Sequence, residues 1–239
     1  MDLENNNEFE EIPEMKKTLE HQELLENGWL REIMEIEEGV TRERIHSMEL
    51  PELLEVFDEI SGEPLEDTQF WRLQTDLLSS CVACQEFAAK GLLHAELSEE
   101  AFMERAKRQG WYADGTPPAF DGKLLEDMGL VVEKQYDATL EDIEQVLESG
   151  GKAIGTVHSA LLEDPELAGI PWLSANRMIQ IIGIDRRDPE TVRVIVNDAC
   201  VADGAGAVYD WSVFEQAWRP GGCYLLSAYA PSIQKGAAK

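Results

Sequence analysis

An α+β fold is predicted for this chain of 239 residues. Apolar residues recur at helical spacing up to about residue 150, and strand-like runs joined by short connections replace them afterwards. Helices followed by a sheet that folds back on itself are typical of α+β domains, whereas alternating units would indicate a parallel sheet. Hydrophobic residues make up 44% of the sequence, which is enough for a sizeable core.

Residues 1–66 form a predicted acidic helical extension, and about the first 14 of them are expected to be disordered. Apolar spacing predicts one helix from Met15 to about Glu38 and another over Leu50–Ile60. Residues 1–70 carry 22 acidic and 5 basic side chains. Two interpretations stay open: an amphipathic appendage packed on the main domain, or an acidic arm that docks on a basic partner.

Residues 67–231 form the predicted main domain, and residues 232–239 a tail. Ser98 suits a helix N-cap, Thr139 and Asp142 suit a capping box, and Gly91 suits a helix stop. The predicted helices cover 75–92, 99–108, 118–128 and 140–149; strands follow at 152–158, 178–184, 192–197 and 224–228, with a short helix at 210–218 before the last strand.

The net charge of −28 restricts the partners of this protein. Such an acidic chain is a poor candidate for binding nucleic acid or an anionic membrane surface, and it favours a basic protein or peptide partner. No run reaches the roughly 18 apolar residues that a membrane span needs, so we expect no membrane insertion. Without a recognisable secretory signal at the start of the sequence, we expect a cytoplasmic protein.

The cysteines do not form a recognisable metal or redox motif. Cys81 and Cys84 share a predicted helix, where two small residues at this spacing more often pack than exchange disulfides. Cys200 and Cys223 are isolated, which makes a four-cysteine zinc site a weak alternative. The histidines share no metal-ligand spacing, so we expect no metal and no cofactor; they are His21, His46, His94 and His158.

Four features follow one another in an order that suits a hydrolase. Gln74 precedes a helix start at residues 79–81, Arg177 opens a strand, and the next strand ends in Asn197 and Asp198. An oxyanion-binding amide, a nucleophile at a helix N-terminus, a base on a strand and a residue that orients the base occur in this order in papain-type sites. The helix dipole would favour a thiolate, and amide groups would bind the oxyanion.

Residues from about 70 to 229 resemble the bacteriocin-processing (double-glycine leader) branch of the papain-like cysteine peptidases and its stand-alone bacterial relatives. The resemblance implies a papain-like fold with a helical half and an antiparallel sheet. Each motif is short, but eight occur in the expected order. They are 71–76 with 82–85, 110–112 with 115–117, 124–129, 138–147, 151–154, 180–185, 194–198 and 214–218.

The sequence departs from this family at both catalytic positions. The resemblance implies a nucleophilic cysteine six residues after Gln74 and a histidine at the strand start, where this chain has Ser80 and Arg177. Cys81 is one residue too far, which turns its side chain by roughly 100° on a helix. Arginine stays protonated at neutral pH and cannot act as a base.

We therefore expect a pseudopeptidase that binds a partner or scaffolds a complex, with no active catalytic residue. Its degenerate site positions are Gln74, Ser80, Arg177, Asn197 and Asp198. Opposite Asp198, Arg177 is expected either to form an ion pair that closes the cleft or to hold a bound carboxylate.

The alternative is an active cysteine hydrolase that uses Cys81 as its nucleophile after a one-residue shift. His158, or a residue of a partner, would then serve as the base.

Overall fold

The computed structural model of this protein describes residues 60–95, 97–167, 173–188 and 190–231. These residues belong to one compact unit, and the predicted domain start at residue 67 stays a prediction. The predicted helix at 15–38, the disorder predicted for about the first 14 residues and the predicted tail at 232–239 lie outside the described residues. Ile60, the last residue of the predicted helix Leu50–Ile60, is instead the first residue of a strand.

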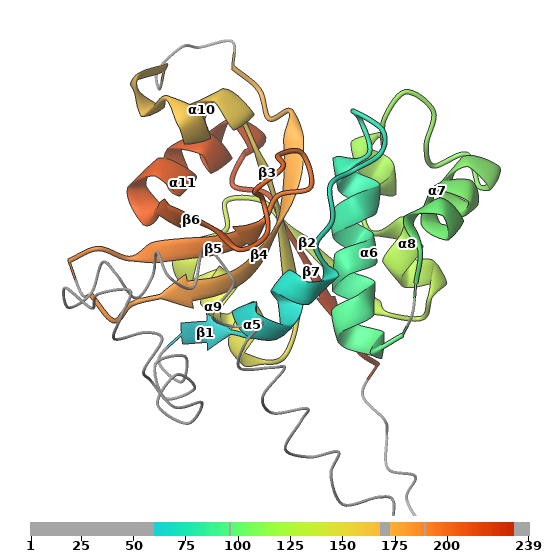
Figure 1. Cartoon of the computed structure of the whole chain (residues 1–239), viewed down its shortest axis with the longest axis horizontal. Coiled ribbons are helices and arrows are strands. Elements are labelled where there is room, and N and C mark those ends of the chain that lie inside the picture. The colour runs from blue at the N-terminus through green and yellow to red at the C-terminus, as the bar shows by residue number, and fades with distance from the viewer. Residues whose placement is uncertain (1–59, 96, 168–172, 189, 232–239) are drawn as a thin grey trace, which may run out of the picture. The chain divides into compact units, whose positions relative to one another are not determined.

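An antiparallel sheet forms the centre of the described domain (Figure 1). Its strands follow the order β2-β7-β3-β4-β5-β6, and β1 pairs with the end of β4 that extends beyond β3. The strands are β1 (Ile60–Gly62), β2 (Val131–Gln135), β3 (Lys152–Val157), β4 (Arg177–Asp185), β5 (Arg193–Asn197), β6 (Ala207–Asp210) and β7 (Leu225–Tyr229).

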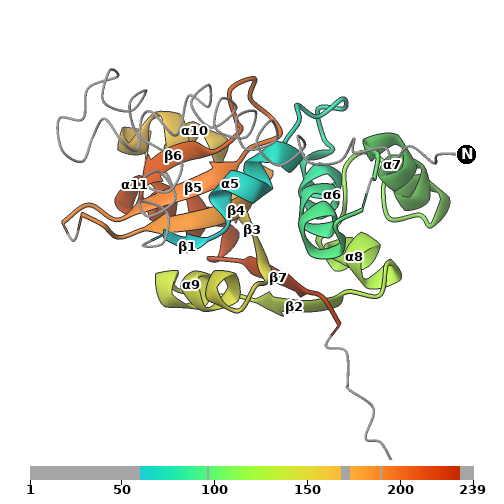
Figure 2. The same cartoon turned by 60° about the horizontal axis from the view of Figure 1, so that its bottom comes forward.

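The helices divide into two groups beside the strands. Figures 1 and 2 both show α6, α7 and α8 on one side, apart from α9, α10 and α11. The α+β prediction, with a helical half and an antiparallel sheet, is thereby confirmed. The helices are α5 (Pro64–Asp67), α6 (Ser80–Leu93), α7 (Glu99–Arg108), α8 (Lys123–Asp127), α9 (Leu140–Glu148), α10 (Ser159–Glu163) and α11 (Trp211–Trp218).

Each group of helices packs its own apolar core against the sheet. Side chains of α9 and α11, such as Ile143 and Trp218, are buried with Ile181 of β4. Phe102 of α7 and Leu125 of α8 pack with side chains of α6 and with Ile154, Met178 and Leu226 of the sheet. Burying apolar area on both faces is the main stabilising contribution to such a sandwich of helices and sheet.

The long helix α6 begins and ends later than the predicted helix 75–92, and its first residue, Ser80, lies within the helix start predicted at 79–81. Asp76 accepts a hydrogen bond from the backbone N–H of Leu78 at 3.0 Å, so residues 75–79 form a turn and not a helical start. At the other end His94 adopts the left-handed conformation that usually ends a helix, and Gly91 lies inside α6. A Cβ at Gly91 would lie 2.7 Å from Cε of Lys152. This glycine therefore serves close packing.

Lys152, which packs against Gly91, belongs to a buried ion pair that joins the helical half to the sheet. Nζ of Lys152 on β3 lies 2.8 Å from Oδ1 of Asp67 on α5. Glu63 adds a second carboxylate at 3.1 Å. Buried charges are tolerated when they are paired in this way, and the pair joins α5 and the C-terminal end of α6 to β3.

Candidate functional site

The fold brings together two residues that are far apart in the sequence, Ser80 and Arg177. Ser80 is the first residue of α6, and Arg177 is the first residue of β4. Oγ of Ser80 accepts a hydrogen bond from the backbone N–H of Met178 at 3.2 Å, which joins the helix start to the strand start. Both residues line the same cleft.

Arg177 forms an ion pair with Asp198, which follows directly after β5. The guanidinium donates to Oδ2 of Asp198, and the Asp198 side chain is fully buried. Its other oxygen accepts a hydrogen bond from the backbone N–H of Cys200 at 2.8 Å. Charge-assisted hydrogen bonds of this kind hold both groups in one orientation. The arginine at the position expected of a base is therefore held as a structural cation.

Asn197 points away from the cleft, because successive side chains of a strand face opposite sides. It is buried, and its Nδ2 donates to the carbonyl of Asp67 at 2.8 Å and to Oε1 of Gln180 at 3.1 Å. Of the two residues predicted to orient a base, Asp198 thus faces the arginine while Asn197 fixes β5 to α5.

Hydrogen bonds to the backbone of Asp198 hold this residue in place. The backbone N–H of Asp198 donates to the carbonyl of Gly204 at 2.8 Å. A Cβ at residue 204 would lie 2.0 Å from the Asp198 carbonyl oxygen, so only glycine permits this approach. The indole N–H of Trp71 donates to the same carbonyl oxygen at 2.8 Å.

Both ends of the Gln74 side-chain amide are engaged by the protein. Its Nε2 donates to the carbonyl of Leu77 at 3.1 Å, and its Oε1 accepts a hydrogen bond from the thiol of Cys200 at 3.3 Å. Gln74 is not among the residues that line the cleft. An oxyanion site needs N–H groups aimed at the reacting atom, and this amide is turned towards its own loop.

Cys200 is a cleft residue that the sequence did not reveal. It is half-buried beside Ser80, Arg177 and Asp198. Burial, reinforced by the charge of Asp198, raises the pKa of its thiol to about 11 despite the opposing charge of Arg177. The thiolate is the reactive form of cysteine, so Cys200 is a protonated, weakly reactive thiol at neutral pH.

Cys81 faces the carboxyl group of Asp121, which also lines the cleft. Its Sγ lies 3.5 Å from Oδ1 of Asp121, and Nε2 of Gln85 donates to the same sulfur at 3.2 Å. Burial first, and then the charge of Asp121, raises the pKa of Cys81 well above its ordinary value. A carboxylate beside a thiol opposes thiolate formation, so this environment is the opposite of that of an activated nucleophile.

The cleft that contains these residues has a volume of about 260 Å³. Its walls come from the loop before α6, the start of α6, the segment before α8, β3, the start of β4 and the turn after β5. The lining residues are Leu77, Leu78, Ser80, Cys81, Gly115, Thr116, Pro118, Asp121, Thr156, Ala175, Asn176, Arg177, Met178 and Cys200. Neither His94 nor His158, the two histidines within the described residues, lines it. A larger hollow of about 530 Å³ lies between α7 and α8, and none of the predicted site residues borders it.

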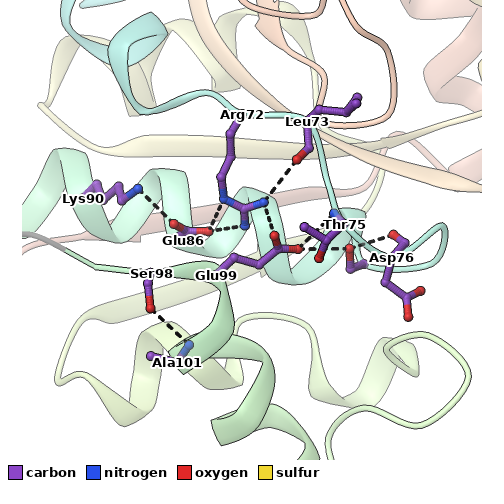
Figure 3. A network of polar contacts seen from close by, with 10 residues as sticks. Arg72, Leu73, Thr75, Asp76, Glu86, Lys90, Ser98, Glu99 and Ala101 are labelled. Atoms are coloured by element: carbon purple, nitrogen blue, oxygen red, sulfur yellow. Dashed lines mark hydrogen bonds and ion pairs between the residues drawn. The ribbon is translucent and has the colours of Figure 1, made fainter.

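A charged network attaches the loop before α6 to the helical half. Arg72 donates to the buried carboxylate of Glu86 on α6 and to Glu99 at the start of α7, and Lys90 lies 2.9 Å from Glu86 (Figure 3). Glu99 also accepts a hydrogen bond from the backbone N–H of Thr75 at 3.3 Å. Arg72 thereby positions the loop that carries Leu77 and Leu78, two exposed residues of the cleft lining.

The described residues hold no group of three or more histidine, cysteine, aspartate or glutamate side chains placed to bind a metal ion. They also contain no helix that is both long and apolar enough to cross a membrane.

Comparison with known proteins finds similarity to solved structures. No protein-family model matches the chain, and no curated protein matches it either. Among solved structures, the chain is similar to a Bacillus anthracis protein described as a C39-like peptidase, with 14% identity and a TM-score of 0.46. The similarity covers 68% of this chain and 94% of that one. Likeness at this level says nothing about catalysis.

Proposed function

We propose that this chain is a non-hydrolytic binding protein, a pseudopeptidase whose cleft holds a segment of a protein or peptide partner. One observation carries the proposal: the two residues at the expected catalytic positions are both used for structure. The Ser80 hydroxyl oxygen accepts from the Met178 backbone, and Arg177 is paired with the buried carboxylate of Asp198. A serine needs a base to take its proton before it attacks a carbonyl, and arginine cannot supply one.

The rim of the cleft supports binding of an extended peptide. Leu77 and Leu78 are 91% and 55% exposed, respectively, and both line the cleft. Exposed apolar side chains beside a concave surface are typical of interaction sites. The net charge of −28 favours a partner with basic residues.

Selection from a displayed peptide library tests this proposal directly. Purified protein is expected to enrich a consistent set of peptides, and their binding is expected to saturate in solution. Leu77→Glu, which adds a charge at the rim without disturbing the core, should weaken that binding at least about tenfold. Val131→Glu is the matched control, because Val131 is 48% exposed on β2 and lies outside the cleft. A library that yields no saturable binder would refute the proposal.

A thiol hydrolase that uses Cys81 is the second candidate, because Cys81 does line the cleft. It would require a base, and His158 is not among the residues lining the cleft. All four cysteines are free thiols, which fits the cytoplasmic location that we propose. Fast reaction of the Cys81 thiol with iodoacetamide at neutral pH would distinguish this candidate from the first.

A further inference from the structure

Asp121 is a buried carboxyl group at the cleft wall that has no cation of its own. It is 5% exposed, and its hydrogen-bond partner is the weakly polar thiol of Cys81. It takes part in none of the ion pairs formed among the described residues. Charged carboxylates are seldom buried in this way unless something pairs with them.

No described residue forms an ion pair with Asp121. Arg177, the basic residue of the cleft lining, is already paired with Asp198. Lys134 on β2 acts on Asp121 through its charge without forming an ion pair with it. The hydroxyl of Tyr224, whose pKa is raised by burial and by the charge of Asp121, is buried without a hydrogen-bond partner among the described residues.

We propose that Asp121 is the recognition site for a basic side chain, lysine or arginine, of the peptide that occupies the cleft. This inference rests on the proposed function, since it names the chemistry of the same ligand. An ammonium or guanidinium group would supply the missing charge and donate hydrogen bonds to the carboxylate. Burial raises the pKa of Asp121 to about 6, so the group is still ionised at pH 7 and is readily stabilised by a cation.

The size and lining of the cleft suit a long side chain with a charged end. Its volume of about 260 Å³ is below the range of roughly 300–1,000 Å³ typical of pockets for small organic ligands. Leu78 and Pro118 line it together with Asp121, and they can contact the methylene groups of lysine or arginine. The ligand group is therefore one side chain of a longer partner.

The test uses the peptides selected in the library experiment, resynthesised with acetylated and amidated ends. At each position we would place lysine, arginine, norleucine or glutamate and measure the dissociation constant by fluorescence anisotropy. At one position, lysine or arginine should bind wild-type protein at least about tenfold more tightly than norleucine. Asp121→Asn should bring this ratio close to one.

Asp137→Asn is the matched control, since it removes the same charge at an exposed residue outside the cleft and keeps a residue that tolerates positive φ. The control should keep the preference. Wild-type protein that binds norleucine as tightly as lysine at every position would overturn the inference and leave the proposed function intact. Equal losses for lysine and norleucine peptides in Asp121→Asn would also overturn it. Failure to select any peptide would refute the proposed function.

Discussion

Two buried aspartates, Asp121 in the cleft wall and Asp198 behind the cleft residue Arg177, differ in how their charge is balanced. Asp198 is paired with Arg177 and accepts the backbone N–H of Cys200. Asp121 hydrogen-bonds with the thiol of Cys81 and forms no ion pair among the described residues, although the charge of Lys134 acts on it. The charge of Asp198 is thus balanced within the protein, whereas that of Asp121 is balanced only in part. On our proposal, a basic group of the ligand supplies the rest.

Removing the paired carboxylate should have the largest effect on stability. Asp198→Ala leaves the guanidinium of Arg177 without its partner and the N–H of Cys200 without its acceptor, which should cost about 3 to 5 kcal/mol of unfolding free energy. Urea denaturation followed by tryptophan fluorescence measures this loss. Asp203→Ala, at an exposed residue of the following turn, should change the stability by less than about 0.5 kcal/mol. A loss below about 1 kcal/mol for Asp198→Ala would contradict the comparison.

Removing a cation from a different pair of carboxylates should have a smaller effect. Arg72→Met separates Glu86 and Glu99 from their shared guanidinium, and Lys90 still pairs with Glu86. Because Arg72 is 25% exposed, we expect a loss of about 2 kcal/mol.

The same variant should expose the loop at residues 73–79 to proteolysis under native conditions. Arg72→Lys should retain part of the stability, since it keeps the charge and loses the planar pair of donors. Equal stability of wild type and Arg72→Met would show that the network is not what holds this loop.

The unpaired carboxylate predicts a smaller effect, of opposite sign. The pKa of Asp121 is about 6 in the folded protein, against an ordinary value of 3.8. As the pH rises, the carboxyl group of Asp121 loses its proton in the unfolded chain before it does so in the folded protein. The free energy of unfolding therefore includes a stabilising contribution from the protonated group below about pH 4, and this contribution is lost as the pH rises through 6. Asp121→Asn should remove this loss and be more stable than wild type at pH 7 by on the order of 1 kcal/mol.

The measurement is the difference between the two stability curves from pH 4 to pH 8. The difference is needed because burial also raises the pKa of Asp67 to about 6, against the opposing charge of Lys152, and this contribution is present in both proteins. A curve for Asp121→Asn parallel to that of wild type would contradict the assignment of an unpaired charge to Asp121.

Each of the two aspartates also lies beside a thiol, and labelling kinetics compare them. Because the pKa of Cys200 is about 11, its reaction with iodoacetamide should be slow at pH 7 and rise about tenfold per pH unit up to about pH 10. Cys81 and Cys84 are buried with raised pKa values and should react only on unfolding. Fast labelling of Cys81 at pH 7 would favour the thiol-hydrolase candidate.

The sequence predicted the elements whose local signals agree with their final structure. Ser98 accepts a hydrogen bond as the N-cap of α7, and Thr139 with Asp142 forms the predicted capping box of α9. The strand β2 was missed, because its mostly exposed residues Val131–Gln135 include two charged side chains and lack a clear alternation. The short β1 and β6 were missed because their pairing with distant strands, rather than local propensity, defines them.

The candidate site was predictable only where chain order carried the information. The resemblance to papain-like peptidases, followed along the chain order, singled out Ser80 and Arg177, and the fold does bring them into one cleft. Nothing local distinguishes Asn197 from Asp198 until the direction of β5 decides which one faces the arginine. Cys200 and Asp121 have no motif, since a carboxyl group becomes informative only when its surroundings are known to be buried and without a cation.

Mass spectrometry of a degenerate peptide library incubated with the protein tests the central claim most directly. The claim is that Ser80 and Arg177 serve structure rather than hydrolysis. We expect wild type, Ser80→Ala and Cys81→Ala to leave the same peptides intact. Cleavage by the wild type that disappears in either variant would contradict it.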